Sequence, residues 1–271
     1  MITNAKMLIS QTANGQQQDI TTAIIANMAF KVTGVMDTAY SMEVKITRVG
    51  LQMKVGGKDL NFDSDKKGQQ DIMSNILGNM TGKAFSLIMT KKGKVASIND
   101  IENIYSNLFD GIPNVTDDQK AQLKNQMIQS FGAKAFKGSI ELGTAIFPDN
   151  KVAKNNTWEI ATQLESIVKA KVKTTFSLQD ITDNSYLVHG DAVMASDKDA
   201  PYTEMNGMPI KYDLTGTSTY EIKLDKVTNW ITEAKINQVM KGNIEIKDNP
   251  RVPGGMTMPM TMNSEQTVTD K

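Results

Sequence analysis

The chain of 271 residues is long enough to bury one large hydrophobic core or two modest ones. Its 30 basic residues balance its 30 acidic residues, so electrostatics gives no reason to expect a nucleic acid or an anionic membrane as a partner. Cysteine is absent, which excludes disulfides, thiol nucleophiles and thiolate metal sites.

The first 65 residues have the alternating pattern of antiparallel strands. Asn14-Gly15 is a strong hairpin signal, and it is followed by an expected strand over residues 18–35. Residues 40–46 alternate apolar and polar side chains, as a strand with one solvated face does. A short closing strand is expected over residues 60–62. This part of the chain therefore predicts a four-stranded meander.

The middle of the chain changes to a helical period. Asn99 and Glu102 have capping-box spacing and predict the start of one helix. Thr116 and Gln119 repeat that spacing and predict a second helix over residues 117–136. One stripe of this second helix is apolar, and we expect it to pack on a sheet; its members are Leu123, Met127, Phe131 and Ala135.

Strands return at Trp158, and part of this second β region echoes the first. Residues 176–188 can be laid on residues 30–42 without a gap. Phe176 then coincides with Phe30, and Tyr186 with Tyr40. Because self-similarity is a primary signal of fold organisation, we interpret this match as an internal duplication of a β-meander block.

These patterns predict an α+β fold with a curved, half-barrel-like antiparallel sheet. Two similar meander blocks form the sheet, and the helices between them pack on one face. We expect a single domain over residues 1–271, divided into a first β block (1–65), an insert of helices and a strand (66–146) and a second β block with a C-terminal strand (147–271).

The residues 85–98 and the segment from Phe147-Pro148-Asp149 to Trp158 carry a resemblance to known proteins. Together with the paired β blocks, they resemble a family of uncharacterised bacterial cell-envelope lipoproteins. The layout is also similar to the half-barrels of periplasmic lipoprotein carriers, which is an analogy of fold alone. The family supplies no catalytic residues.

This resemblance implies an exported protein that is periplasmic or associated with the outer membrane. Its members look tethered through a lipidated cysteine upstream of the domain. Residues 1–8 lack the apolar region of a signal peptide, and they lie inside the expected first strand. We therefore expect a truncated chain or an unusual member, whose export signal and anchor lie outside this sequence. The longest uncharged run, residues 252–264, is rich in Gly, Pro and Thr, so no transmembrane segment is predicted.

Three groups of side chains are candidate metal or catalytic sites. Asp63-Ser64-Asp65 with Gly68 opens like a calcium loop, but Lys67 stands where an oxygen ligand is needed and Ser74 where a bidentate Glu is needed, which favours an Asx-rich turn. His189 is the single histidine, and we expect it on the solvated face of a strand. The last group is a row of alternating thioethers that could hold Cu(I), although we expect them to pack inward as gap-filling side chains: Met256, Met258, Met260 and Met262.

The sequence favours a non-enzymatic protein without a metal or cofactor, because it shows no catalytic motif. A lipid or another apolar small molecule is the expected ligand, held on the concave face of the sheet. The side chains expected to line that site are Leu123, Met127, Phe131, Phe30 and Phe176. The alternatives are a structural or protein-interaction module of the cell envelope, and, ranked last, a hydrolase that uses carboxylates.

Overall fold

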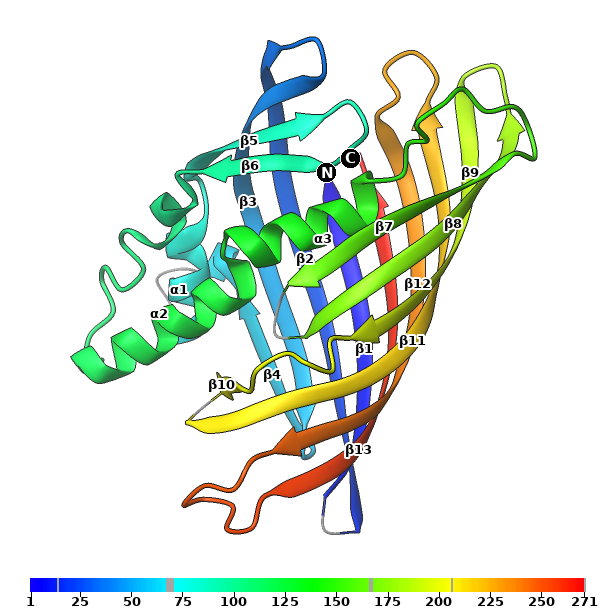
Figure 1. The fold of residues 1–271 in the computed structure, drawn as a ribbon. Coiled ribbons are helices and arrows are strands. Elements are labelled where there is room, and N and C mark those ends of the chain that lie inside the picture. Colours follow the sequence, from blue (N-terminus) through cyan, green and yellow to red (C-terminus); the bar gives the residue numbers. More distant parts are fainter. Residues whose placement is uncertain (14, 67–70, 166–167, 206, 271) are drawn as a thin grey trace.

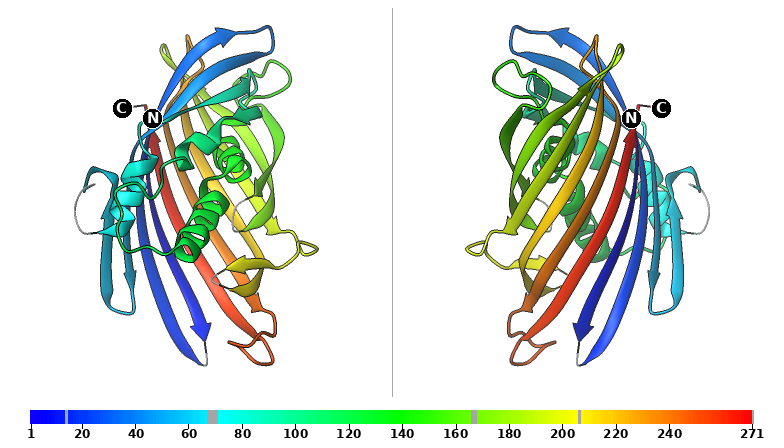
Figure 2. Two further views of the ribbon diagram at one scale, coloured as in Figure 1. Left: turned by 90° about the vertical axis from the view of Figure 1, so that its left-hand side faces the viewer. Right: turned by 90° about the vertical axis from the view of Figure 1, so that its right-hand side faces the viewer.

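The structure is a computed structural model that describes residues 1–13, 15–66, 71–165, 168–205 and 207–270. Its main feature is one open, curved sheet in which every pair of neighbouring strands is antiparallel (Figure 1). The few helices lie on the concave side of this sheet (Figure 2). The fold is therefore mostly sheet, and the expected α+β class overstated the helical share.

Thirteen strands form the sheet within the described residues. Their order is β6-β5-β3-β2-β1-β13-β12-β11-β9-β8-β7, with β4 beside β3 and β10 beside β11. The strands are β1 (Ile2–Ala13), β2 (Gln16–Val35), β3 (Ala39–Val55), β4 (Lys58–Asp63), β5 (Ala84–Thr90), β6 (Val95–Asn99), β7 (Thr157–Glu165), β8 (Lys169–Ile181), β9 (Ser185–Ser196), β10 (Thr203–Met205), β11 (Met208–Asp225), β12 (Ile231–Ile246) and β13 (Met256–Thr269). The two ends of this order, β6 and β7, are edge strands.

The helices differ from the expected ones in two places. The first helical segment after Asn99 is only a 3-10 turn, η2 (Ile101–Tyr105), whose N-terminus has no side-chain cap, so the expected capping box there is wrong. The cap at Thr116 is confirmed, because its hydroxyl accepts from the Gln119 N–H and the Gln119 side chain accepts from the Thr116 N–H. The remaining helical elements are η1 (Ser64–Lys66) and α1 (Ile72–Met80).

The helix expected over residues 117–136 is divided at Gly132. It forms α2 (Asp117–Phe131) and α3 (Ala133–Thr144), with Gly132 in an extended conformation between them. A Cβ at Gly132 would lie 2.3 Å from the Ile128 carbonyl oxygen, so the backbone at the end of α2 leaves no room for a side chain at this position. The apolar stripe is thereby split, and it is α3, not α2, that buries side chains in the core.

The two hairpins that contain Phe30 and Phe176 have the same register. Phe30 pairs with Val44 across β2 and β3, and Phe176 pairs with Gly190 across β8 and β9. In both hairpins the register shifts between the second and fourth residues after the phenylalanine. The two phenylalanines therefore hold equivalent strand positions, although Phe30 is half-buried and Phe176 is buried. Duplication of the whole blocks stays a prediction, and Asn14 of the expected first hairpin lies outside the described residues.

The core consists of two hydrophobic clusters that α3 and the segment after it connect. Phe136 and Ile140 of α3 belong to the first cluster, which lies against β3 and β5. Leu142 and Ile146 belong with the second cluster, which lies against β8, β9, β11 and β12. The ring of Phe136 makes an edge contact with Phe85 of β5, with centroids 5.1 Å apart. Burial of α3 is therefore shared by both halves of the sheet.

Helix α3 also spans the opening between the two edge strands (Figure 1). The Glu141 carboxylate accepts a hydrogen bond of 2.7 Å from the backbone N–H of Val95, the first residue of β6. On the other side α3 packs against β7, and the Trp158 indole of β7 donates to the Ile146 carbonyl at 2.8 Å. An unpaired sheet edge is an aggregation hazard, and here α3 covers both edges at once.

We expect Glu141→Ala to destabilise the protein by about 1–3 kcal/mol, because it leaves the buried Val95 N–H without an acceptor. Glu141→Gln keeps an acceptor oxygen and is expected to cost less. Urea unfolding measures both changes. Glu159→Ala is the matched control: its ion pair with Lys173 is exposed, so its loss is expected to cost about 0–1 kcal/mol. Equal losses for Glu141→Ala and Glu159→Ala would contradict the bridging role.

The division of the helix gives a second stability prediction. Phe136→Ala is expected to cost about 3–5 kcal/mol, because it removes a buried ring and leaves a cavity beside Phe85. Phe131→Ala, at the end of α2, is expected to cost clearly less, since that ring is only half-buried. Thermal or urea unfolding of the pair checks this order, and a larger loss for Phe131→Ala would show that α2 is the helix that anchors the core.

Candidate functional site

A cavity of about 850 Å³ lies on the concave side of the sheet, at the end where several hairpins meet. Its walls come from β2, β3 and β5, from the turn that joins β11 to β12, and from the end of α3. Most of the lining is apolar, and the side chains that dominate it are Val32, Tyr40, Met42, Met89, Phe147 and Trp230. It is more enclosed than the larger cavity of about 1100 Å³ that α3 and the strands β7, β8 and β9 line.

Trp230 is held at the cavity by a tightly bonded turn. The Asp225 carboxylate accepts hydrogen bonds from the N–H groups of Val227 and Thr228 and from the Thr228 hydroxyl, at 2.7–3.1 Å. Asn229 adopts a positive φ of 58°, and the Asp225 N–H donates to the Trp230 carbonyl at 2.8 Å. These backbone bonds to Thr228 hold the pKa of Asp225 below its ordinary value. The turn therefore presents Trp230 in a fixed position.

The opposite wall is held by a close approach between the β5–β6 turn and the end of α3. Gly93 has a φ of 75°, and a Cβ there would lie 1.7 Å from the Thr144 carbonyl oxygen. The Thr144 hydroxyl donates to the Gly93 carbonyl at 2.7 Å. Phe147 follows directly after this contact and lines the cavity. Any side chain at position 93 would push the two elements apart.

The cavity combines an apolar floor with a polar rim. Met42 and Met89 are buried on neighbouring strands, and methionine adapts its shape to irregular ligands. Hydroxyl, carboxylate and ammonium groups surround the apolar part; the rim residues are Thr90, Lys91, Thr144, Asp225, Thr228 and Asp270. Small-molecule sites are usually concave, of about 300–1,000 Å³, and mostly apolar with a few polar groups. This arrangement suits a small amphipathic ligand.

The five expected ligand residues do not form one site. Phe30 lies next to the cavity, because its ring makes an edge contact with Trp230 at 5.9 Å. Leu123, Met127 and Phe131 pack partly buried against the first cluster, but none of them lines the cavity. Phe176 is buried in the second cluster, stacked on Trp158 at 5.9 Å.

Sequence reasoning missed Trp230, Met89 and Phe147 as site residues. Trp230 could have been recognised from the sequence, because a tryptophan that ends a polar turn is expected to expose its ring, and an exposed tryptophan ring needs an explanation. Met89 and Phe147 carry no such signal, because their pattern is that of ordinary core residues. Their convergence on Trp230 depends on the curvature of the sheet.

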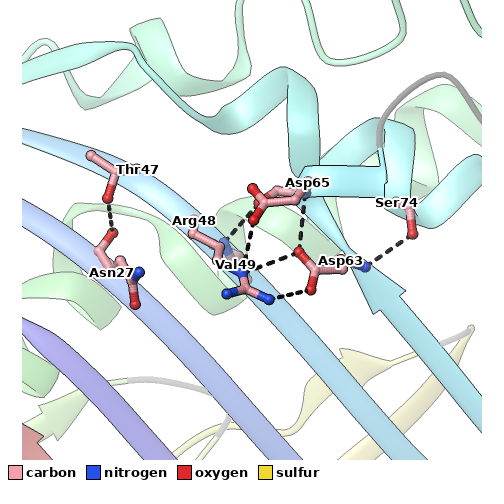
Figure 3. Close-up of polar contacts among 8 residues, drawn as sticks. Asn27, Thr47, Arg48, Val49, Asp63, Asp65 and Ser74 are labelled. Atoms are coloured by element: carbon pink, nitrogen blue, oxygen red, sulfur yellow. Dashed lines mark hydrogen bonds and ion pairs between the residues drawn. The ribbon is translucent and has the colours of Figure 1, made fainter.

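The two aspartates of the candidate calcium loop bind an arginine side chain. Arg48 on β3 bonds Asp63 at 2.8 Å and Asp65 at 3.1 Å (Figure 3). This bond to Arg48 holds the pKa of Asp63 below its ordinary value. The Ser74 hydroxyl accepts from the Asp63 N–H at 3.0 Å, while Lys67 and Gly68 lie outside the described residues. Both carboxylates are therefore part of a structural ion-pair network.

Three of the four methionines of the β13 row pack inward as expected. Met260 is buried in the second cluster, and Met258 and Met262 pack against it. Among the residues that the structure describes, no three His, Asp or Glu side chains are grouped so that they could hold a metal ion.

His189 lies between two carboxylates on the outer face of the sheet. Its Nδ1 is 2.6 Å from Glu221 and its Nε2 is 3.1 Å from Asp191. Burial disfavours the charged ring, but the hydrogen bonds to Glu221 and Asp191 favour it, and together they raise the pKa of His189 above its usual value. Carboxylates contact both ring nitrogens, which differs from a catalytic triad, where one ring nitrogen faces a hydroxyl.

The raised pKa gives a testable pH dependence. A raised folded-state pKa means that the His189 contribution to stability is fully present below its unfolded pKa, and is lost as the pH rises through its folded pKa. Glu221→Gln is expected to lower the pKa of His189, because it removes a carboxylate partner. Proton NMR follows this directly, since there is only one histidine. Glu233→Gln on the adjacent β12 is the control, and an unchanged pKa in Glu221→Gln would contradict the ion pair.

Comparison with known proteins places most of the chain in one family. A family model described as "Family of unknown function (DUF6263)" matches residues 37–231, which run from the start of β3 to the first residue of β12. No curated protein matches the chain. In the described part of the chain, none of the helices has the length and apolar character needed to cross a membrane.

Proposed function

We propose that this chain, which belongs to that family of unknown function, is a non-enzymatic protein. In this proposal it binds a lipid or another apolar small molecule in the cavity at the end of the curved sheet. The observation that carries the proposal is the cavity of about 850 Å³ whose apolar walls converge from four distant parts of the chain. Its size and its apolar floor with a polar rim match those of small-molecule sites.

The ligand proposed here is amphipathic. Its apolar part contacts Met42, Met89 and Trp230, where desolvation of methionine and aromatic surface stabilises the complex. Its polar part remains at the rim, beside Lys91 and the carboxylates of Asp225 and Asp270. A free fatty acid or a lysolipid has this division, and its acyl chain supplies the apolar part.

The proposed compartment is the cell envelope. It rests on the resemblance of residues 85–98 and 147–158 to envelope lipoproteins and on the analogy of fold between the curved sheet and the half-barrels of lipoprotein carriers. An upstream lipidated cysteine would provide the membrane tether. Fractionation of cells that express the complete gene product tests this placement, and recovery in the cytosolic fraction contradicts it.

A second candidate function is an interaction module without a small ligand. The observation that favours it is the position of α2, which has no buried residue and exposes Ile128 to solvent. An apolar side chain on the solvent-facing side of such a helix can contact a protein partner. Ile128→Asp would then abolish capture of a specific envelope protein, without changing binding in the cavity.

Trp230 is a direct reporter of ligand binding. The chain has two tryptophans, so Trp158→Phe leaves Trp230 as the single tryptophan, which can be excited selectively over the tyrosines. A fatty acid brominated near its end quenches a tryptophan that it contacts. We expect saturable quenching in Trp158→Phe and little quenching in Trp230→Phe, where Trp158 remains in the second cluster.

The mouth of the cavity supplies a matched pair of variants. Val32 lines the cavity and is 51% exposed, while Val239 lies on the outer face of β12 and is 50% exposed. In the Trp158→Phe background, Val32→Asp is expected to weaken binding about tenfold or more, because it places a charge against the apolar ligand. Val239→Asp is expected to leave binding unchanged. Absence of saturable quenching in the parent protein would sink the proposed function.

A further inference from the structure

Three hairpin tips project from the same end of the sheet (Figure 1). They are the turns that join β2 to β3, β8 to β9, and β11 to β12. Lys226 of the third tip ties it to the second, since its N–H donates to the Asn184 carbonyl and its ammonium to the Thr182 carbonyl, both at 3.0 Å. Val32 and Thr228 line the same cavity, which places the first and third tips beside it.

Each of these tips exposes a large apolar side chain. Val227 is 89% exposed, Val35 is 72% exposed, and Met36 and Ile181 are each 42% exposed. Turn residues are usually Gly, Pro, Asn, Asp or Ser, each for a local backbone reason. The backbone of the third tip is already held by Asp225 and Asn229, so Val227 is not needed for the turn itself. Such a side chain gains stability only when something covers it.

We propose that the three tips insert into the surface of a zwitterionic lipid bilayer, with the mouth of the cavity facing the membrane. This inference rests on the proposed function, because it names the bilayer as the source or destination of the cavity's ligand. Insertion of apolar side chains at the boundary between headgroups and acyl chains is stabilised by the apolar area buried there.

Two features favour a bilayer over a protein surface. The apolar side chains stand on three separate turns with polar residues between them, such as Asp37 and Asn184. A stable protein interface has a continuous apolar core, whereas separate tips each insert independently into lipid. Charges at the tips are also mixed, with Asp37 and Asp183 set against Lys226, so attraction to anionic lipid is not required.

The absence of cysteine makes labelling of a single tip straightforward. Val227→Cys, labelled with an environment-sensitive fluorophore, is expected to show a blue shift and increased emission with phosphatidylcholine vesicles. Val239→Cys, in the middle of β12, is the matched control and is expected to show no change. If the emission of the Val227→Cys label instead changes with protein concentration in the absence of vesicles, the tips bind a second copy of the chain and the proposal is wrong.

Vesicle flotation measures the binding itself. Val35→Asp and Val227→Asp are each expected to weaken binding about tenfold, and Val239→Asp to have no effect. Both tip positions are exposed, so unchanged circular dichroism shows that these variants still fold. Flotation of the tip variants equal to that of the unmodified protein, or failure of that protein to float, overturns the proposal.

The proposed ligand site and the proposed membrane contact are tested independently of each other. Quenching of Trp230 by a brominated fatty acid is measured without vesicles and reports the cavity alone. Intact quenching without flotation rejects the membrane contact and leaves the ligand site standing. Flotation that depends on Val227 without any quenching rejects the ligand site, and the tips then serve attachment alone.

Discussion

The structure depends on a single helix that covers both open edges of the sheet. A curved sheet that does not close leaves unpaired backbone groups on its first and last strands, and such edges pair readily with other chains. Here Glu141 accepts the hydrogen bond of Val95 on β6, while the same helix packs against β7. Phe136 and Ile146 join this segment to the two clusters of the core. The same helix therefore fills the curved sheet and packs against both of its end strands.

The cavity follows from that curvature. Phe30 lies on β2 and Trp230 in the turn directly before β12, and β1 and β13 lie between these two strands, yet the two rings are 5.9 Å apart. Such a contact forms only if the sheet bends enough to bring β2 and the β11–β12 turn together. Gly93 and Thr144 then set the third wall, at the end of the bridging helix. The position of α3 and the cavity therefore both follow from the curvature of the sheet.

Polar groups serve mainly to position elements. Arg48 holds Asp63 and Asp65, which fixes the end of β4 and the turn η1 against β3. The Val49 N–H donates to the buried Ser64 hydroxyl at 3.0 Å. In the sequence, Asp63 and Asp65 have the spacing that opens a calcium loop. Their arginine partner, rather than their spacing, decides that this is a structural network.

Local patterns by themselves determined the strands, several turns and the Thr116 cap, because alternation and capping depend on neighbouring residues. The common register of the Phe30 and Phe176 hairpins also follows a match that is visible in the sequence. Only the tertiary structure decided that Gly132 divides the long helix and that α3 spans the sheet edges. It also placed Trp230, Met89 and Phe147 in one cavity, and Phe176 in a different cluster. The physical reason is that curvature sums small twists over many strands, and no short stretch of sequence records that sum.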